Sequence, residues 1–197
     1  MCKPLVSAGA DDTYRMHSDS ADFDAQCVTV AARYADARGW MAQAFLSTIE
    51  VEGEYSLMYF DGAFSHAVQK VPKSGDFRVQ TVFGATTINA DAAARDGLPL
   101  RAAADRVMAA LHALRSAWAH SASVSAGGSA SSQASDSVMP PLQARVDLVR
   151  DPRSTREEPR FWLMELELIE PCLYMTQSDG RGPENFVAAL RRQYPCV

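Results

Sequence analysis

The chain has 197 residues, of which 47% are hydrophobic, so it can bury a sizeable core as one domain or as two small lobes. A net charge of −5 argues against a nucleic acid or an anionic membrane as partner. No apolar run approaches the ~20 residues that span a bilayer, and the N-terminus lacks a signal-peptide core, so we expect a cytoplasmic protein.

The four cysteines show no C-x-x-C spacing, which argues against a zinc site and favours free thiols in a reducing compartment. They are Cys2, Cys27, Cys172 and Cys196. Three of the four histidines, His66, His112 and His120, have no serine or cysteine nucleophile in a matching pattern, so we expect them to be structural or exposed to solvent.

The first segment predicts a short strand around Lys3, a loop of small residues from Ser7 to Asp12, and a returning strand that reaches Arg15. Small residues let backbone N–H groups approach a phosphate, and a lysine at the strand end supplies a positive charge. The segment lacks the G-x-x-x-x-G-K-[ST] pattern of a Walker loop. Alone it is a weak signal, because a lysine beside a turn is usually a surface lysine.

Further along, the pattern alternates between helices and strands and predicts an α+β fold. Val107, Leu111, Leu114 and Trp118 form an apolar stripe that we expect to be buried, and the last helix should bury Phe186, Val187 and Leu190. Asp61 and Gly62 mark a hairpin turn. The expected helices are 21–39, 100–120 and 182–193, and the expected strands are 41–46, 54–60, 63–71 and 77–84.

Residues 121–141 are almost entirely Ser, Ala and Gly. Such a segment buries too little apolar surface to offset its ordering entropy, so we expect a disordered insertion. A loop without a function is preferred over a phosphorylation or partner site.

Two strands near the C-terminus carry the charges that point to chemistry. Side chains alternate along a strand, so Arg145 and Asp147 share one face, as do Glu165 and Glu167. A charged, proline-containing loop joins these strands, which predicts that they are antiparallel neighbours. Three carboxylates crowded in this way need solvent or a cation, and an all-oxygen site suits Mg²⁺. The plain alternative is a polar sheet face exposed to water, which these residues alone favour.

Taken in order, six segments resemble the ATP-grasp carboxylate–amine ligases, most closely the branch of bacterial glutathione synthetase and D-cycloserine ligase. The resemblance runs from Lys3 to about Leu173. The segments are Lys3-Pro4 with its loop, Met41–Leu46, Gly53–Ser56, Gly75–Gln80, Arg145–Asp147, and Glu165–Glu167 with Pro171. Because the six segments follow the order found in the family, we prefer a metal site over an exposed polar face as the interpretation of the three carboxylates.

The resemblance implies an ATP-grasp fold of two α+β lobes that grip ATP. It divides the chain into 1–46 (the rest of a small lobe and a hinge), 47–120 with 142–197 (a large lobe), and the insertion 121–141. The implied nucleotide contacts are Lys3, Ser7 and Gly9 at the phosphates, the hinge residues Gln43, Phe45 and Leu46 at the adenine, and Glu54 at the ribose or a phosphate.

The same resemblance assigns the chemistry. It makes Arg78, near the transferred phosphate and the substrate carboxylate, and Arg145, at the acyl-phosphate transition state, the catalytic residues. It makes Asp147, Glu165 and Glu167 the ligands of Mg²⁺ or Mn²⁺. The last ligand is usually asparagine in the family, whereas position 167 of this chain is glutamate.

The expected partners are ATP and a small carboxylate or amine substrate, and a homodimer is compatible with this reading. Family members carry an N-terminal domain ahead of the strand that holds Lys3, so we expect a truncated chain. The alternative to a ligase is therefore a non-catalytic nucleotide-binding or interaction module.

Overall fold

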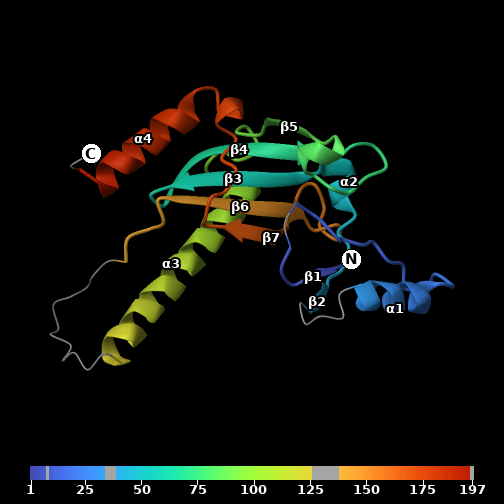
Figure 1. Cartoon of the computed structure of the whole chain (residues 1–197). Coiled ribbons are helices and arrows are strands. Elements are labelled where there is room, and N and C mark those ends of the chain that lie inside the picture. Colours follow the sequence, from blue (N-terminus) through green and yellow to red (C-terminus); the bar gives the residue numbers. More distant parts are fainter. Residues whose placement is uncertain (8, 34–38, 126–137, 196–197) are drawn as a thin grey trace.

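The computed structural model describes residues 1–7, 9–33, 39–125 and 138–195. It contains two antiparallel sheets and four α-helices (Figure 1). The smaller sheet is formed by β1 (Cys2–Pro4) and β2 (Trp40–Ala42), and α1 (Phe23–Arg33) lies between these strands in the chain. No helix among the described residues is long and apolar enough to cross a membrane.

The larger sheet has the strand order β5-β4-β3-β6-β7, with every neighbouring pair antiparallel. The short helix α2 (Thr48–Glu52) leads into its central strand. The strands are β3 (Glu54–Phe60), β4 (Ala63–Val71), β5 (Thr86–Asn89), β6 (Gln143–Arg150) and β7 (Phe161–Glu167). This topology confirms the predicted hairpin at Asp61-Gly62 and the predicted antiparallel pairing of the two charged strands.

Each face of the large sheet is covered by one helix (Figure 1). Helix α3 (Pro99–Ser125) packs Leu100, Ala104 and Met108 against Leu57 and Val146 of the sheet. On the opposite face, α4 (Arg181–Gln193) packs Ala189 and Phe186 against Met58, Phe60 and Val68. Arg145 and Asp147 of β6 lie on this second face, because Val146 and Leu148, which alternate with them, pack on the face covered by α3.

Two predicted strands are wrong in part or in full. The strand expected at 41–46 ends at Ala42, after which the backbone N–H of Gln43 donates to the carbonyl of Met1 and the chain turns into α2. The strand expected at 77–84 is absent, and residues 81–83 form a 3₁₀ turn. The carboxylate of Asp76 accepts the backbone N–H groups of Phe77 and Arg78, so these donors are satisfied locally instead of by a neighbouring strand.

The expected stripe of α3 is buried only in its first half. Val107 and Leu111 pack against the core, whereas Leu114 is 70% exposed and Trp118 is 79% exposed. Figure 1 shows the reason, because α3 runs on past the sheet that covers its first turns. Val187 of α4 is likewise 43% exposed, while Phe186 and Leu190 are partly buried.

The helix expected at 21–39 is confirmed for Phe23–Arg33, and residues 34–38 lie outside the described residues. The expected insertion at 121–141 starts too early, because α3 continues through Ser125. Residues 126–137, which make up most of that insertion, lie outside the described residues, and β6 starts at Gln143.

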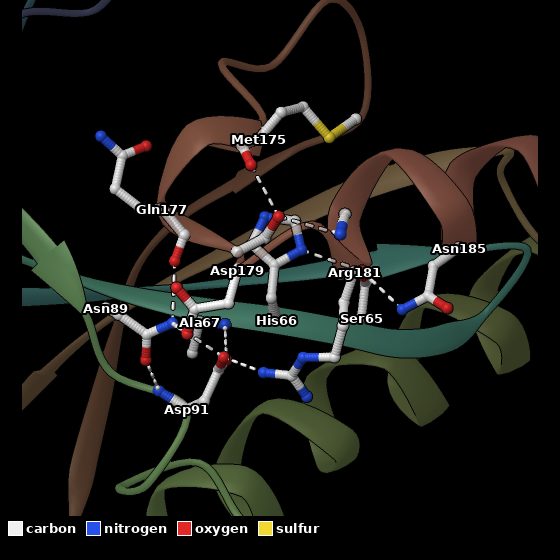
Figure 2. A network of polar contacts seen from close by, with 12 residues as sticks. Ser65, His66, Ala67, Asn89, Asp91, Met175, Gln177, Asp179, Arg181 and Asn185 are labelled. Atoms are coloured by element: carbon white, nitrogen blue, oxygen red, sulfur yellow. Dashed lines mark hydrogen bonds and ion pairs between the residues drawn. The ribbon is translucent and has the colours of Figure 1, made fainter.

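A polar network ties β4, β5 and α4 together around His66 (Figure 2). A β-bulge at Ser65 places its hydroxyl 2.8 Å from Nδ1 of His66, while Nε2 of His66 lies 2.8 Å from the carbonyl oxygen of Leu173. Asn185 of α4 donates to the same hydroxyl. Burial lowers the pKa of His66 below its ordinary value, so a neutral imidazole that donates from Nε2 and accepts at Nδ1 fits these contacts. His66 is therefore structural, as expected.

His66 should make stability depend on pH. Because its pKa is lower in the folded chain, the unfolded chain binds the extra proton, and the stability that the neutral ring contributes is lost as the pH falls below the unfolded pKa of about 6.5. Asp91 and Arg181 face the ring and act in opposite directions on its pKa. We expect the free energy of unfolding to fall less between pH 7 and pH 5 in His66→Gln than in the wild type, as measured by urea titrations at both pH values. Equal falls would contradict this role.

Gly53 fixes the junction between α2 and β3. Its φ of 76° and ψ of −158° lie in a region that is essentially restricted to glycine, and a Cβ atom there would lie 2.1 Å from the carbonyl oxygen of Lys70. We expect Gly53→Ala to destabilise the chain by about 3 kcal/mol or more, from backbone strain and from the clash. Gly97→Ala is the control, because Gly97 also has a positive φ but open space around it. If thermal unfolding showed a similar loss of stability in both variants, the clash with Lys70 would be excluded as the cause.

Candidate functional site

A cavity of about 470 Å³ lies between the small sheet and the face of the large sheet that carries the charged residues. Its volume falls in the range of ~300–1,000 Å³ that is common for small-ligand sites. The described residues that line it come from β1 and its loop, the segment after β2, helix α2, the loop after β4, strands β3, β4, β6 and β7, and the segment after β7. Of the predicted site residues, the lining includes Lys3, Ser7, Gly9, Gln43, Phe45, Leu46, Glu54, Arg78, Arg145, Glu165 and Glu167.

One end of the cavity is apolar. Ile49 and Val79 belong to a buried cluster against which Phe45, Phe77 and Met164 pack, and all five side chains line the cavity. The rings of Phe45 and Phe77 meet edge to face with 6.0 Å between their centroids. This end can take a flat apolar group.

Arg15 packs over the Phe45 ring at the apolar end of the cavity. The guanidinium carbon of Arg15 lies 3.9 Å from the centroid of the Phe45 ring, and its NH1 lies 2.5 Å from Oε1 of Glu50 in α2. A cation above an aromatic face is favourable, and here it joins the segment after β1 to the segment after β2. The position of the Phe45 ring is therefore fixed from two sides.

The other end of the cavity is ionic and is built across four strands of the sheet. Glu54 of β3 is the cross-strand partner of Lys70 of β4, and the two side chains form a direct ion pair. Asp147 of β6 lies behind the lining, fully buried, with Oδ2 at 3.3 Å from Nζ of Lys70. Arg145 binds the same carboxylate in a bidentate manner, with Nε–Oδ1 at 2.9 Å and NH2–Oδ2 at 2.8 Å.

The two glutamates of β7 complete this end. The strand register sets Glu165 opposite Asp147 and Glu167 opposite Arg145, and the Arg145 NH2 lies 2.5 Å from Oε1 of Glu167. Glu165 is the most accessible of the three carboxylates, with 54% of its side chain exposed. Together Glu54, Lys70, Arg145, Asp147, Glu165 and Glu167 form what we term the ionic cluster.

The predicted metal ligands are brought together. Asp147, Glu165 and Glu167 each offer a carboxylate oxygen, and these oxygens lie within 4.8 Å of one another. In the ionic cluster, four carboxylates face the two cations Lys70 and Arg145, which leaves two negative charges when all groups are ionised. An all-oxygen donor set with this excess charge fits a divalent cation such as Mg²⁺.

The protonation of the ionic cluster follows from burial and neighbouring charge. Burial by itself would lower the pKa of Lys70, but the carboxylates of Glu54 and Asp147 outweigh it and raise that pKa. Burial raises the pKa of Glu54 to about 7, against the attraction of Lys70. Burial would also raise the pKa of Asp147, but Lys70 and Arg145 lower it. Lys70 and Arg145 therefore stay cationic, and Asp147 stays anionic, at neutral pH.

Lys70 and Tyr174 are site residues that the sequence analysis missed. Lys70 occupies an inward position of β4, two residues after the buried Val68, and a cation at such a position was an available signal. Tyr174 follows β7 with a left-handed backbone, and its ring lies 5.8 Å from the guanidinium carbon of Arg145. No pattern in the sequence marks it. The carboxylate of Glu54 forms an ion pair with Lys70. The sequence analysis predicted only a contact of Glu54 with the ribose or a phosphate.

Removal of Lys70 should leave buried carboxylates without their counter-ion. We expect Lys70→Met to lower the free energy of unfolding by about 3–5 kcal/mol, the usual cost of breaking a buried ion pair from one side. The exposed Lys73→Met is the matched control and should change it by less than about 0.5 kcal/mol. Adding Glu54→Gln to Lys70→Met should recover part of the loss in chemical denaturation. Equal, small effects at both lysines would show that the ion pair is not structural.

The chain is similar to known proteins in sequence and in fold. The model of the family described as prokaryotic glutathione synthetase, ATP-grasp domain, matches residues 1–116. The crystal structure of D-cycloserine synthetase DcsG is similar over 98% of this chain and 54% of that one, with a TM-score of 0.64 and 25% identity. D-alanine–D-alanine ligase from Bacillus anthracis, solved with ATP, gives a TM-score of 0.44 at 11% identity over 99% of this chain and 60% of that one, a likeness too weak to argue from.

The chain spans about half the length of the first of these solved proteins. No curated protein matches it. The family match covers more than half of the chain and the structural likeness covers nearly all of it, and the α+β architecture with its antiparallel sheets is that of an ATP-grasp fold. The chain belongs to the family of the prokaryotic glutathione synthetase ATP-grasp domain.

Proposed function

We propose that the cavity binds ATP together with Mg²⁺, with the base at the apolar end and the triphosphate at the ionic cluster. The observation that carries this proposal is the polarity of the cavity, which changes from Phe45, Ile49 and Phe77 at one end to Lys70 and Arg145 at the other. A nucleotide has the same two halves, a flat base and a polyanion. The match of the family model to an ATP-grasp domain supports it.

The base would be read by the backbone of the segment after β2. Among the described residues, the backbone groups of Ala44 and Phe45 form no hydrogen bond, whereas Gln43 is paired with Met1. A free carbonyl and a free N–H along one edge can accept from the adenine amino group and donate to the adjacent ring nitrogen. This arrangement favours adenine over guanine, which presents a carbonyl where adenine presents an amino group.

The triphosphate would meet the cations. Lys70 and Arg145 project into the ionic end, and Lys3 with the backbone at Ser7 and Gly9 approaches from the small sheet. Asp147, Glu165 and Glu167 would hold the divalent cation, which neutralises phosphate charge when bound. Without it, these carboxylates repel the triphosphate.

The reaction that we propose is ligation of a carboxylate to an amine through an acyl phosphate. A substrate carboxylate attacks the γ-phosphate and releases ADP, and the amine then displaces phosphate from the acyl phosphate. Arg78 and Arg145 would offset the charge on the group in transfer, so the work of the protein is positioning and electrostatics. The likeness to D-cycloserine synthetase supports a ligase of this class. We assign residues 1–46 to a small lobe with its hinge, and the large sheet with its helices to a large lobe.

A second function has one observation in its favour. The family model that matches residues 1–116 describes an ATP-grasp domain and not a whole ligase, which supports a nucleotide-binding module without turnover as the second candidate. ADP formation with a panel of amino-acid and amine substrates separates the two. Substrate-dependent ADP supports the ligase, and nucleotide binding without ADP supports the module.

Calorimetry with ATP tests the binding proposal. We expect ATP to bind with Mg²⁺, to bind far more weakly in EDTA, and to be preferred to GTP. Glu165→Gln should weaken the Mg²⁺-dependent part by about 1–3 kcal/mol, because it removes a charged ligand, and Glu158→Gln in the exposed loop after β6 should not. Equal ATP affinity in EDTA and in Mg²⁺ would overturn the metal site, and no ATP binding under either condition would overturn the proposed function.

A further inference from the structure

A second cavity, of about 510 Å³, lies at the edge of the large sheet. It is lined by residues from the first turns of α3, from the loop between β6 and β7, and from the start of the edge strand β7. It shares no lining residue with the cavity that holds the ionic cluster, and its volume is also that of a small-molecule site. It is therefore a separate place at which a ligand could bind.

The charge of this second cavity is positive. Its lining includes three arginines, Arg106 of α3 and Arg153 and Arg160 of the loop, and its single carboxylate among the described residues is Asp151. Hydrogen bonds from Arg153 lower the pKa of Asp151 to about 2, so this carboxylate is ionised at neutral pH. Three cations and one anion leave two positive charges, in a chain whose net charge is −5. A dianion would balance them.

The arginines keep donors that the protein does not use. Arg153 binds Asp151 through Nε and NH2, at 3.0 Å and 3.2 Å, and the Asp151 side chain is only 4% exposed, so the guanidinium is fixed on a buried anchor. Arg160 NH2 lies 3.7 Å from Oδ2 of the same carboxylate. Within the part of the chain that the structure describes, NH1 of Arg153 donates no hydrogen bond, and Arg106 forms neither a hydrogen bond nor an ion pair. Oxyanions are the ligands that such guanidinium groups bind.

An aromatic surface lies beside these cations. Phe161 packs against the core under α3, whereas the next residue, Trp162, is 47% exposed. Both line the cavity, and the guanidinium carbon of Arg153 lies 5.6 Å from the centroid of the Trp162 ring. An inorganic anion would leave this indole in water, but a ligand with an apolar part could cover it. The cavity thus suits an organic anion better than a bare one.

We propose that this second cavity binds a small organic dianion, either a phosphate monoester or a dicarboxylate. The charged oxygens would contact Arg106, Arg153 and Arg160, and the apolar part would lie against Trp162. Both kinds of ligand present paired oxygens and two negative charges, which match the guanidinium groups and the charge of the cavity. The inference goes beyond the proposed function and does not rest on it, because the nucleotide would lie in the other cavity.

The test is calorimetry on the full chain in EDTA at about pH 8, where a phosphate monoester carries close to two charges. The probes are phenyl phosphate, phthalate and inorganic phosphate. We expect one molecule of phenyl phosphate or of phthalate to bind per chain, and the tighter of the two identifies the charged group that the site prefers. Inorganic phosphate should bind at least about fivefold more weakly than that probe, because it cannot cover the indole.

Substitutions locate the site. Arg106→Gln and Arg160→Gln should each weaken the tighter probe about 10-fold, as the loss of a hydrogen bond to a charged group predicts. Arg156→Gln is the matched control, because Arg156 is exposed in the same loop but does not line the cavity, and it should change the affinity by less than about twofold. Trp162→Leu should weaken the two organic probes and leave the affinity for inorganic phosphate within about twofold. Circular dichroism melts establish that each variant is folded.

The outcomes separate this inference from the proposed function. The inference is overturned if neither organic probe binds, if Arg106→Gln and Arg160→Gln bind like the wild type, or if Arg156→Gln loses as much affinity as they do. It is also overturned if a non-hydrolysable ATP analogue with Mg²⁺ displaces the probe, since the anion would then lie in the nucleotide cavity. A chain that binds the probe but no nucleotide overturns the proposed function and leaves this inference standing.

Discussion

The ion pairs between Lys70 and the carboxylates of Glu54 and Asp147 are the constraint on which the site depends. A charged group inside a sheet is tolerated only when opposite charges and hydrogen bonds compensate for lost hydration. The strand register provides this compensation, because Glu54 faces Lys70 across β3 and β4, and Asp147 is reached from β6. If either strand pair slipped by one residue, a charged side chain would point into the apolar core under α3. The requirement for charge balance therefore specifies the register of the central strands.

The same balance bears on the proposed binding of ATP together with a divalent cation. Arg145 is shared among Asp147 and Glu167, and its pKa is raised because these carboxylates outweigh its burial. The cluster keeps an excess of negative charge next to two permanent cations. A polyanion without a metal ion is attracted by Lys70 and Arg145 but repelled by the glutamates. A divalent cation without the polyanion is attracted by the carboxylates but repelled by Arg145. In the proposed complex, each ligand would therefore make the cluster more favourable for the other, and the two would bind cooperatively.

Much of this arrangement could be predicted from the sequence, because alternation along a strand is a local property. The faces of Arg145, Asp147, Glu165 and Glu167 followed from alternation alone, and the structure bears out both the shared face and the antiparallel pairing. The inward position of Lys70 on β4 was a local signal that the sequence analysis did not use, whereas its contact with Asp147 depends on the pairing of β3 with β6, which is not local. The strand expected at 77–84 failed for a different reason, since the side chain of Asp76 competes for the backbone donors that a ladder would need. In α3 the apolar periodicity was sound, but the sequence does not say where the covering sheet ends.

The overhang of α3 has a spectroscopic consequence. The three tryptophans of the chain lie in three separate places: Trp40 is on the small sheet beside Tyr14, Trp118 is on the part of α3 that extends past the sheet, and Trp162 is near the start of β7. None belongs to the buried clusters on the two faces of the large sheet. Trp118 is already in contact with water in the folded chain, so it contributes emission at long wavelength that changes little on unfolding. Intrinsic fluorescence of this protein consequently reports on its periphery, and replacing Trp118 with phenylalanine would leave an emission spectrum dominated by the small sheet and the edge strand.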